Sequence, residues 1–169
     1  MSEFIKIGHE KIEDNPFKLI GKDWMLITAG KKDDFNTMTA SWGGLGFLWN
    51  KPICHIYVRP HRFTYSFIER YDFFTLSFFE EKYRECLNIC GTKSGRDIDK
   101  PKAAGLTPVA DGKSVYFNEA RLVIECRKIY YQDIDPAFFI DSAIEANYPQ
   151  KDYHRMYIGE VVNTLKNKG

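Results

Sequence analysis

The chain has 169 residues, a formal net charge of +1, and 28% charged residues. This balance argues against a broad nucleic-acid-binding surface, because such a surface needs a marked excess of Lys and Arg. The length fits a single domain over residues 1–169 that buries one core. Aromatic residues make up 15% of the sequence, and because they favour strands, the composition predicts a mainly β domain.

No apolar run approaches the roughly 20 residues that a membrane-spanning helix needs, and residues 1–6 lack the charge pattern of a signal peptide. We therefore expect a cytoplasmic protein without a membrane segment. Cys54, Cys86, Cys90 and Cys126 form no Cys-x-x-Cys pair, so we expect buried free thiols in a reducing compartment. Cys86 and Cys90 could share a metal ion on a helix, but further ligands are missing nearby, and we expect no metal site.

The first predicted element is a β-hairpin. Residues 24–29 and 37–42 have strand composition and flank a polar turn at 30–34. The glycines of 43–46 then predict a flexible turn, since the pattern is not a dinucleotide-binding fingerprint. A third strand is expected at 53–58.

A short helix is expected next, with Thr64 as its N-cap and with Phe63, Phe67 and Tyr71 recurring at four-residue spacing. Residues 73–78 predict a fourth strand. A second helix is expected over 80–90, with Gly91 as its stop signal.

The C-terminal half predicts more strands. Residues 94–110 have no clear period and are expected to run over the surface. Residues 114–118 and 121–131 predict a second hairpin, and 137–145 and 155–162 predict two final strands. About eight short strands without βαβ alternation favour an antiparallel barrel with two or three helices over a Rossmann sheet.

One segment of the predicted hairpin is rich in small hydroxyl residues: Asn36-Thr37-Met38-Thr39-Ala40-Ser41-Trp42. Because few bulky side chains stand in the way, its backbone N–H groups and hydroxyls can reach a flat polar ligand. Trp42 continues this segment and is expected beside such a ring. Core packing is the alternative for Trp42, and it is equally open for Trp49.

Arg59, Arg62 and Thr64 bring two cations and a hydroxyl to the predicted start of a helix, which favours an anion. The alternative is that both arginines form salt bridges with surface carboxylates. A planar ring held by hydrogen bonds, next to a phosphate held by cations, is the outline of flavin mononucleotide (FMN). The loop with Ser94 and Arg96 is either a second clamp on this ligand or an ordinary polar loop.

The four histidines are too dispersed in the sequence to predict a metal cluster. His55 lies in an apolar strand and is expected to be a hydrogen-bonded core residue. His154 precedes the last strand, whose Gly159 permits close backbone approach. His154 either donates to the cofactor or substrate, as the one possible catalytic residue, or caps the end of a strand.

With these motifs assembled, the sequence resembles the flavin reductase-like family of FMN-binding split-barrel proteins, which includes flavoredoxins. The resemblance rests on an ordered set of motifs that spans nearly the whole chain. They are Asn36-x-Met38-Thr39-Ala40-Ser41-Trp42, Tyr57-Val58-Arg59-Pro60-x-Arg62-x-Thr64, Phe74-Thr75-Leu76-Ser77-Phe78-Phe79, Gly105-Leu106-Thr107, Glu119-Ala120, and His154-Arg155-Met156-Tyr157-Ile158-Gly159-Glu160-Val161.

The resemblance implies a six-stranded antiparallel split barrel with helices, which works as a homodimer with FMN near the subunit interface. Residues 36–42 would contact the isoalloxazine and ribityl portion, largely through backbone groups. The residues implied near the phosphate are Arg59, Arg62, Thr64, Ser94 and Arg96, and His154 matches a histidine often placed near the flavin. Relatives often carry Asp-Lys-Phe in the loop where this chain has Ser94-Gly95-Arg96-Asp97-Ile98-Asp99-Lys100-Pro101, which leaves the role of Lys100 and the register of the loop open.

We therefore expect an FMN-dependent oxidoreductase that accepts hydride from NAD(P)H, with the flavin carrying the redox chemistry. It would be either a reductase that releases reduced flavin or a flavoredoxin-like electron carrier with a redox protein partner. The alternative from another class is a non-catalytic split-barrel module that holds flavin or another planar ligand.

Overall fold

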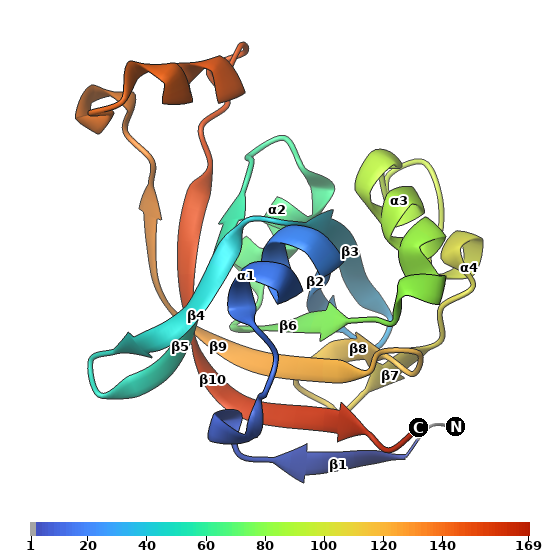
Figure 1. The fold of residues 1–169 in the computed structure, drawn as a ribbon. Coiled ribbons are helices and arrows are strands. Elements are labelled where there is room, and N and C mark those ends of the chain that lie inside the picture. The colour runs from blue at the N-terminus through green and yellow to red at the C-terminus, as the bar shows by residue number, and fades with distance from the viewer. Residues whose placement is uncertain (1–2) are drawn as a thin grey trace.

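A computed structural model describes residues 3–169, which form one curved antiparallel sheet, a small separate hairpin and several short helices (Figure 1). The main sheet has the strand order β3-β2-β6-β9-β10-β5-β4, with β1 paired to the C-terminal part of β10. Its strands are β1 (Phe4–Ile7), β2 (Met25–Lys31), β3 (Asp34–Ala40), β4 (Gly43–Leu48), β5 (Lys51–Val58), β6 (Phe73–Phe78), β9 (Leu122–Asp133) and β10 (Arg155–Asn167). The separate hairpin pairs β7 (Pro108–Ala110) with β8 (Val115–Phe117).

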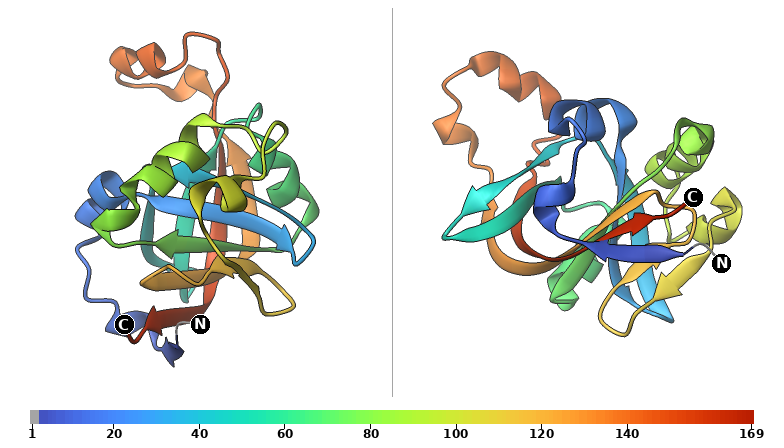
Figure 2. Two further views of the ribbon diagram at one scale, coloured as in Figure 1. Left: turned by 90° about the vertical axis from the view of Figure 1, so that its right-hand side faces the viewer. Right: turned by 60° about the horizontal axis from the view of Figure 1, so that its bottom comes forward.

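The helices are short and lie around the sheet rather than between its strands (Figure 2). The α-helices are α1 (Pro16–Lys18), α2 (Phe63–Arg70), α3 (Arg84–Thr92) and α4 (Lys100–Ala104). The 3-10 turns are His9–Lys11, Glu81–Tyr83, Pro136–Phe138 and Ser142–Asn147, and Leu19–Asp23 forms a π-helical turn.

The sheet curls so that the end of β3 leads directly into the start of β4, which makes it a split barrel. β3 and β4 lie at opposite ends of the strand order, yet only Ser41 and Trp42 separate them in the chain. Among the described residues, neither strand has a partner strand on its outer edge. The prediction of an antiparallel, mainly β barrel is confirmed.

Alternation along the strands produces two apolar clusters. Met25 and Ile27 of β2 face the barrel interior, while Leu26 between them faces the outside. Phe67 and Ile68 of α2 join the interior cluster, so this helix contributes to the barrel core. The outer cluster is covered by α3, α4 and the β7–β8 hairpin. Burial on both faces explains why the first three residues of β2, Met25 to Ile27, are all apolar.

The segment 43–46 is a strand rather than the flexible turn predicted from its glycines. It forms the first part of β4 and pairs with β5 from Gly43 opposite Ile56 to Leu48 opposite Lys51. Ladder hydrogen bonds use backbone groups alone, so glycine does not prevent them. At Gly44 a Cβ atom would clash with the ring of His55, which explains the need for glycine there.

The N-terminal half of the prediction is otherwise largely correct. The first hairpin forms as β2 and β3, and the strands predicted at 53–58 and 73–78 lie in β5 and β6. The helix predicted over 80–90 starts with a 3-10 turn and continues as α3 to Thr92. Thr64 is not the N-cap of α2, because the helix begins at Phe63 and Arg62 occupies the cap position.

Two predictions in the C-terminal half are wrong. Residues 115–117 pair with β7 and not with β9, which instead lies between β6 and β10. Residues 137–145 form 3-10 turns rather than a strand. The reason is local: Asp135 and Asp141 accept hydrogen bonds from the backbone N–H groups of Ala137 and Ala143 and so start helical turns.

These turns belong to an arm, residues 134–154, that connects β9 to β10. The arm projects from one end of the barrel, as the orange segment in Figures 1 and 2 shows. Its two ends are held together by the register of Arg155 with Asp133 and by a hydrogen bond from the Ile134 N–H to the His154 carbonyl. His154, the last residue of the arm, therefore lies at the end of the barrel, directly before β10.

Candidate functional site

A cavity of about 220 Å³, here called the strand-end cavity, lies where β3 passes into β4. It is lined by Met38, Thr39, Ala40, Ser41, Trp42, Tyr57, Arg59, Arg62 and His154. All of these except Tyr57 are site residues predicted from the sequence. The fold thus brings the hydroxyl-rich segment, the arginines after β5 and the histidine before β10 to one place.

The wall formed by β3 is suited to hydrogen bonding. Because β3 is an end strand of the sheet, the backbone groups on its outer edge have no partner strand. The Thr39 hydroxyl is already occupied, since it donates to the carbonyl of Leu87 in α3. The groups of this wall that can hydrogen-bond a ligand are therefore mainly backbone N–H and C=O groups. Trp42 lies at its end with 47% of its surface exposed.

Arg62 carries an incomplete set of hydrogen bonds. Its Nη1 donates to the Gly91 carbonyl over 3.0 Å, whereas its Nη2 is buried and has no partner. Burial lowers the pKa of Arg62, and the nearby positive charge of Arg59 lowers it further. A buried guanidinium group without a counter-charge is costly. The position therefore favours an anion close to Nη2.

Arg59 is engaged differently. Its Nη1 donates to both carboxylate oxygens of Asp152 over 2.8 and 2.7 Å, and its Nη2 donates to the Asn147 carbonyl. The guanidinium group also lies over the ring of Tyr148, 5.0 Å from its centre. All three partners belong to the arm. Of the two readings that the sequence left open, a salt bridge describes Arg59, and an unpaired cation describes Arg62.

His154 is a buried, uncharged wall of the cavity. Burial lowers its pKa to about 4, helped by the charge of Arg59, so the ring is neutral at physiological pH. Its Nδ1 lies 2.8 Å from the hydroxyl of Tyr148. Its ring packs against Trp42, with 5.2 Å between centres.

Asn36, Thr37 and Thr64 lie behind this wall rather than in it. The Asn36 amide donates to the Thr64 hydroxyl over 2.7 Å, and the Thr37 hydroxyl bonds with that of Thr28. All of these side chains are buried. They link β3 to α2 and β2, and their predicted contact with a cofactor stays a prediction.

Ser94 and Arg96 also lie outside the lining of the strand-end cavity. The Ser94 hydroxyl accepts a hydrogen bond from the Arg96 N–H in a local turn. The Arg96 guanidinium group lies over Phe63 and donates to the His61 carbonyl. Their predicted role in phosphate binding is likewise not decided by these contacts.

Lys100, whose role the sequence left open, is a buried support of the same wall. It lies in α4, where the sequence predicted a surface excursion, and its Nζ donates to the carbonyls of Thr37 and Cys90. Burial lowers its pKa to about 8, and the charge of Arg62 contributes. The signal in the sequence was Asp99-Lys100-Pro101-Lys102, since Asp99 caps α4 and Pro101 suits a first helical turn.

His55 differs from the prediction of a hydrogen-bonded core residue. Its Nδ1 is buried without a partner, and burial lowers the pKa of its ring. The prediction overlooked that Gly44, on the neighbouring strand, leaves space for the ring.

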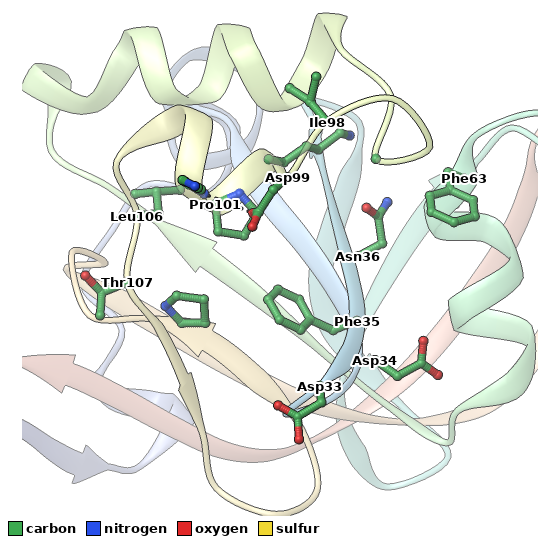
Figure 3. Close-up of a pocket in the computed structure, with 14 residues that line it drawn as sticks. Asp33, Asp34, Phe35, Asn36, Phe63, Ile98, Asp99, Pro101, Leu106 and Thr107 are labelled. Carbon is green, nitrogen blue, oxygen red and sulfur yellow. Dashed lines mark hydrogen bonds between the residues drawn. The ribbon is translucent and has the colours of Figure 1, made fainter.

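A larger cavity of about 590 Å³ lies beside β3 and α4, and Figure 3 shows Phe35 and Asp99 facing it. It is lined partly by the carboxylates of Asp33, Asp34 and Asp99. Lys100, the buried cation at its wall, already donates to two backbone carbonyls. Its lining carries three carboxylates beside Lys100 and Lys102, whereas no carboxylate of residues 3–169 lines the strand-end cavity, so size alone does not make the larger cavity the better anion site.

Two kinds of feature are absent from residues 3–169. No helix in that range is both long enough and apolar enough to cross a membrane. Within the same range, no three His, Cys, Asp or Glu side chains group as a metal site would require.

The sequence model of the flavin reductase-like domain matches residues 18–169. The chain belongs to the flavin reductase-like family. Solved structures of this fold agree, although their sequence identities are low. An FMN-binding domain of a flavin reductase-like enzyme from Shewanella baltica has a TM-score of 0.70 at 17% identity, covering 98% of this chain and 78% of that chain.

Flavoredoxin of Desulfovibrio vulgaris has a TM-score of 0.67 at 22% identity, covering 97% of this chain and 78% of that one. A Streptomyces globisporus NADH:FAD oxidoreductase, in complex with NAD and FAD fragments, has a TM-score of 0.63 at 15% identity, covering 87% and 78%. At these identities the likeness shows a shared fold.

The strand-end cavity fits the flavin expected of a flavin reductase-like protein. It combines an unpaired strand edge, a half-exposed indole, a neutral imidazole and one buried guanidinium nitrogen without a partner. These are groups suited to the polar edge of the ring, its flat face and a phosphate.

Proposed function

We propose that this chain is an FMN-dependent oxidoreductase that takes electrons from NAD(P)H. The observation that carries this proposal is Arg62, whose buried Nη2 has no partner at a cavity that also contains Trp42 and the edge of β3. We propose FMN rather than FAD because the cavity is small and offers one unpaired cationic group, which suits a single phosphate.

Each side of the cavity has its own part in the proposal. The backbone edge of β3 would hydrogen-bond the polar edge of the ring, and Trp42 would cover part of its flat surface. Arg62 would hold the phosphate through a charge-assisted hydrogen bond. Asn36, Thr37, Thr64 and Lys100 would keep β3 and α2 in register from behind.

A bound flavin supplies the hydride and electron transfer. The residues of the chain then have to bind and orient it, and to keep the site uncharged where the ring lies. His154 suits this task, because its pKa of about 4 keeps the imidazole neutral. His154 is the one side chain that we propose to contact the reacting ring as a hydrogen-bonding group.

The nicotinamide donor is proposed from the family. The Streptomyces globisporus protein is an NADH:FAD oxidoreductase, and a nicotinamide that stacks transiently on the flavin needs no glycine fingerprint for dinucleotide binding, which the segment 43–46 does not have. Two fates of the reduced flavin fit the proposal. The chain either releases reduced flavin or, like a flavoredoxin, retains it and passes electrons to a protein partner.

The proposal is tested by comparing FMN with riboflavin, which lacks the phosphate. In Arg62→Ala the Kd for FMN should rise about 10- to 100-fold, as expected for loss of a hydrogen bond to a charged group. The Kd for riboflavin should stay within about twofold. Flavin fluorescence titration measures both ligands in each variant.

Arg70→Ala is the matched control, because Arg70 ends the helix that Arg62 precedes but pairs with Asp34 on the surface. It should leave both Kd values unchanged. Arg96→Ala tests the predicted second clamp, and a loss of FMN affinity alone would support it. Equal losses for FMN and riboflavin in Arg62→Ala would remove Arg62 from the phosphate.

Steady-state oxidation of NADH with added free flavin distinguishes the two oxidoreductase outcomes. Saturable dependence on FMN would support release, and a retained flavin with negligible turnover would support an electron carrier. The visible absorption spectrum addresses the non-catalytic alternative. A protein that is colourless after incubation with FMN and removal of the free flavin by gel filtration would contradict the proposal, while bleaching of bound flavin by NADH would support it.

A further inference from the structure

Tyr148 of the arm forms a buried hydrogen bond with the cavity residue His154. The Tyr148 hydroxyl lies 2.8 Å from His154 Nδ1, and the two residues are 5% and 7% exposed. Neither atom has another side-chain partner within residues 3–169. The direction of this one hydrogen bond therefore decides which imidazole nitrogen carries the proton.

The chemistry of the two groups sets that direction. A phenol is a stronger acid than the N–H of a neutral imidazole, and an imidazole lone pair is a stronger base than a phenol oxygen. The hydroxyl of Tyr148 is therefore the better donor and Nδ1 the better acceptor. Burial raises the pKa of Tyr148, which keeps the phenol protonated and able to donate to Nδ1.

The other ring nitrogen, Nε2, is the one available to a ligand. His154 lines the strand-end cavity, and its Nε2 makes no hydrogen bond with any residue in the described range 3–169. The buried atoms without a partner include His55 Nδ1 but not His154 Nε2. His154 Nε2 is therefore not sealed inside the protein. With Nδ1 turned to Tyr148, a proton on Nε2 becomes a donor that a bound molecule can reach.

We propose that Tyr148 is a positioning residue that fixes His154 in the Nε2–H form, so that the cavity offers a neutral hydrogen-bond donor to a carbonyl oxygen or ring nitrogen of a planar ligand. The identification of that ligand as a flavin rests on the proposed function. The tautomer itself does not, because it follows from contacts within the protein.

The surrounding groups hold this arrangement in place. The Tyr148 ring packs against Tyr153, with 4.9 Å between centres, and lies under the Arg59 guanidinium group. Arg59 and Asp152 are paired beside His154, and His61 lies 3.2 Å from the same carboxylate. The charge of Arg59 opposes a second positive charge on the imidazole, so a neutral donor is the form that this neighbourhood permits.

The first test needs no ligand. The ¹⁵N NMR shifts of the two imidazole nitrogens in flavin-free protein report which one is protonated. We expect the Nε2–H form for His154 in the wild type and a mixture of tautomers in Tyr148→Phe. Tyr153→Phe is the matched control, because its hydroxyl contacts Glu145 and not His154, and it should keep the wild-type signals. A wild-type Nδ1–H form, or unchanged signals in Tyr148→Phe, would overturn the proposal.

The second test asks whether the donor is used. Loss of one neutral hydrogen bond should weaken FMN and riboflavin by the same factor of about 3 to 10 in Tyr148→Phe, with Tyr153→Phe unchanged. A shifted tautomer with full affinity for both ligands would refute the donor role. If wild-type protein shows the Nε2–H form but binds neither FMN nor riboflavin, the proposed function fails while the tautomer assignment stands.

Discussion

Arg59 and Arg62 are three residues apart and look alike in the sequence, yet they have different surroundings. Arg59 is paired with Asp152 and also donates to the Asn147 carbonyl of the arm, whereas Arg62 retains a buried nitrogen without a partner. The sequence predicts both as phosphate ligands because it shows their charge and their position before a helix. It could not reveal that a segment 93 residues further along supplies a carboxylate to only one of them.

At the same scale, His154 predicts how stability depends on pH. Its pKa falls from the ordinary 6.5 to about 4 on folding, so between these values the unfolded chain binds the proton more readily. This contribution to stability is complete above about pH 6.5 and decreases as the pH falls towards 4. From pH 7 to pH 5, flavin-free wild type should lose about 1–2 kcal/mol more unfolding free energy than His154→Gln.

Urea denaturation at both pH values measures this difference. His9→Gln is the control, because His9 lies on an exposed 3-10 turn, and it should behave as the wild type does. Equal losses in wild type and His154→Gln would show that the imidazole does not resist protonation.

At the scale of elements, local composition predicted the strands that alternate regularly and missed those that depend on distant partners. β2, β3, β5 and β6 carry apolar residues at strand spacing, and all four were predicted. Three of the first four residues of β4 are glycine, and the segment becomes a strand because β5 pairs with it. Similarly, β8 looked like a partner for β9, but it pairs with β7 across a turn in which the Asp111 carboxylate accepts from the Ser114 N–H.

Gly159 of β10 gives an element-scale prediction. A Cβ atom there would lie 2.7 Å from the Phe74 ring and 2.8 Å from Cys126 Cβ inside the barrel. Gly159→Ala should therefore overpack the core and lower the unfolding free energy by about 1–3 kcal/mol. Gly46→Ala in β4 is the matched control, because a Cβ atom at Gly46 would meet nothing within 4 Å beyond its own neighbours in the chain.

Urea midpoints of the two variants provide the measurement. Gly46→Ala should stay within about 0.5 kcal/mol of the wild type, as exposed substitutions usually do. A Gly159→Ala protein as stable as the wild type would mean that β10 can shift away from Phe74 at little cost.

At the scale of the whole molecule, the arm exposes apolar side chains that the chain itself does not cover. Phe138 is 79% and Ile140 102% exposed, and both lie on the segment that projects beyond the barrel (Figure 1). Exposed apolar groups of this kind mark interaction sites. The sequence predicted a strand here, so it gave no indication of the projection, although the family resemblance predicted a homodimer.

We expect the homodimer to depend on this arm. In the double variant Phe138→Asp, Ile140→Asp, light scattering after size-exclusion chromatography should give a monomer mass, while the wild type should give twice that mass. Ile5→Asp is the control, because Ile5 is exposed on β1 at the opposite end of the molecule (Figure 1). A monomeric wild type would refute the predicted assembly. A dimeric double variant would show that the interface does not depend on the arm.

The two-residue connection at Ser41 and Trp42 has a consequence for the stability and the solubility of the protein without its cofactor. β3 and β4 are the end strands of the sheet, and their outer borders are templates that foreign strands can extend into aggregates. A molecule bound in the strand-end cavity would cover the end of the β3 border and would add its binding energy to the folded form. Supply of the cofactor would then govern not only turnover but also how much intact protein persists.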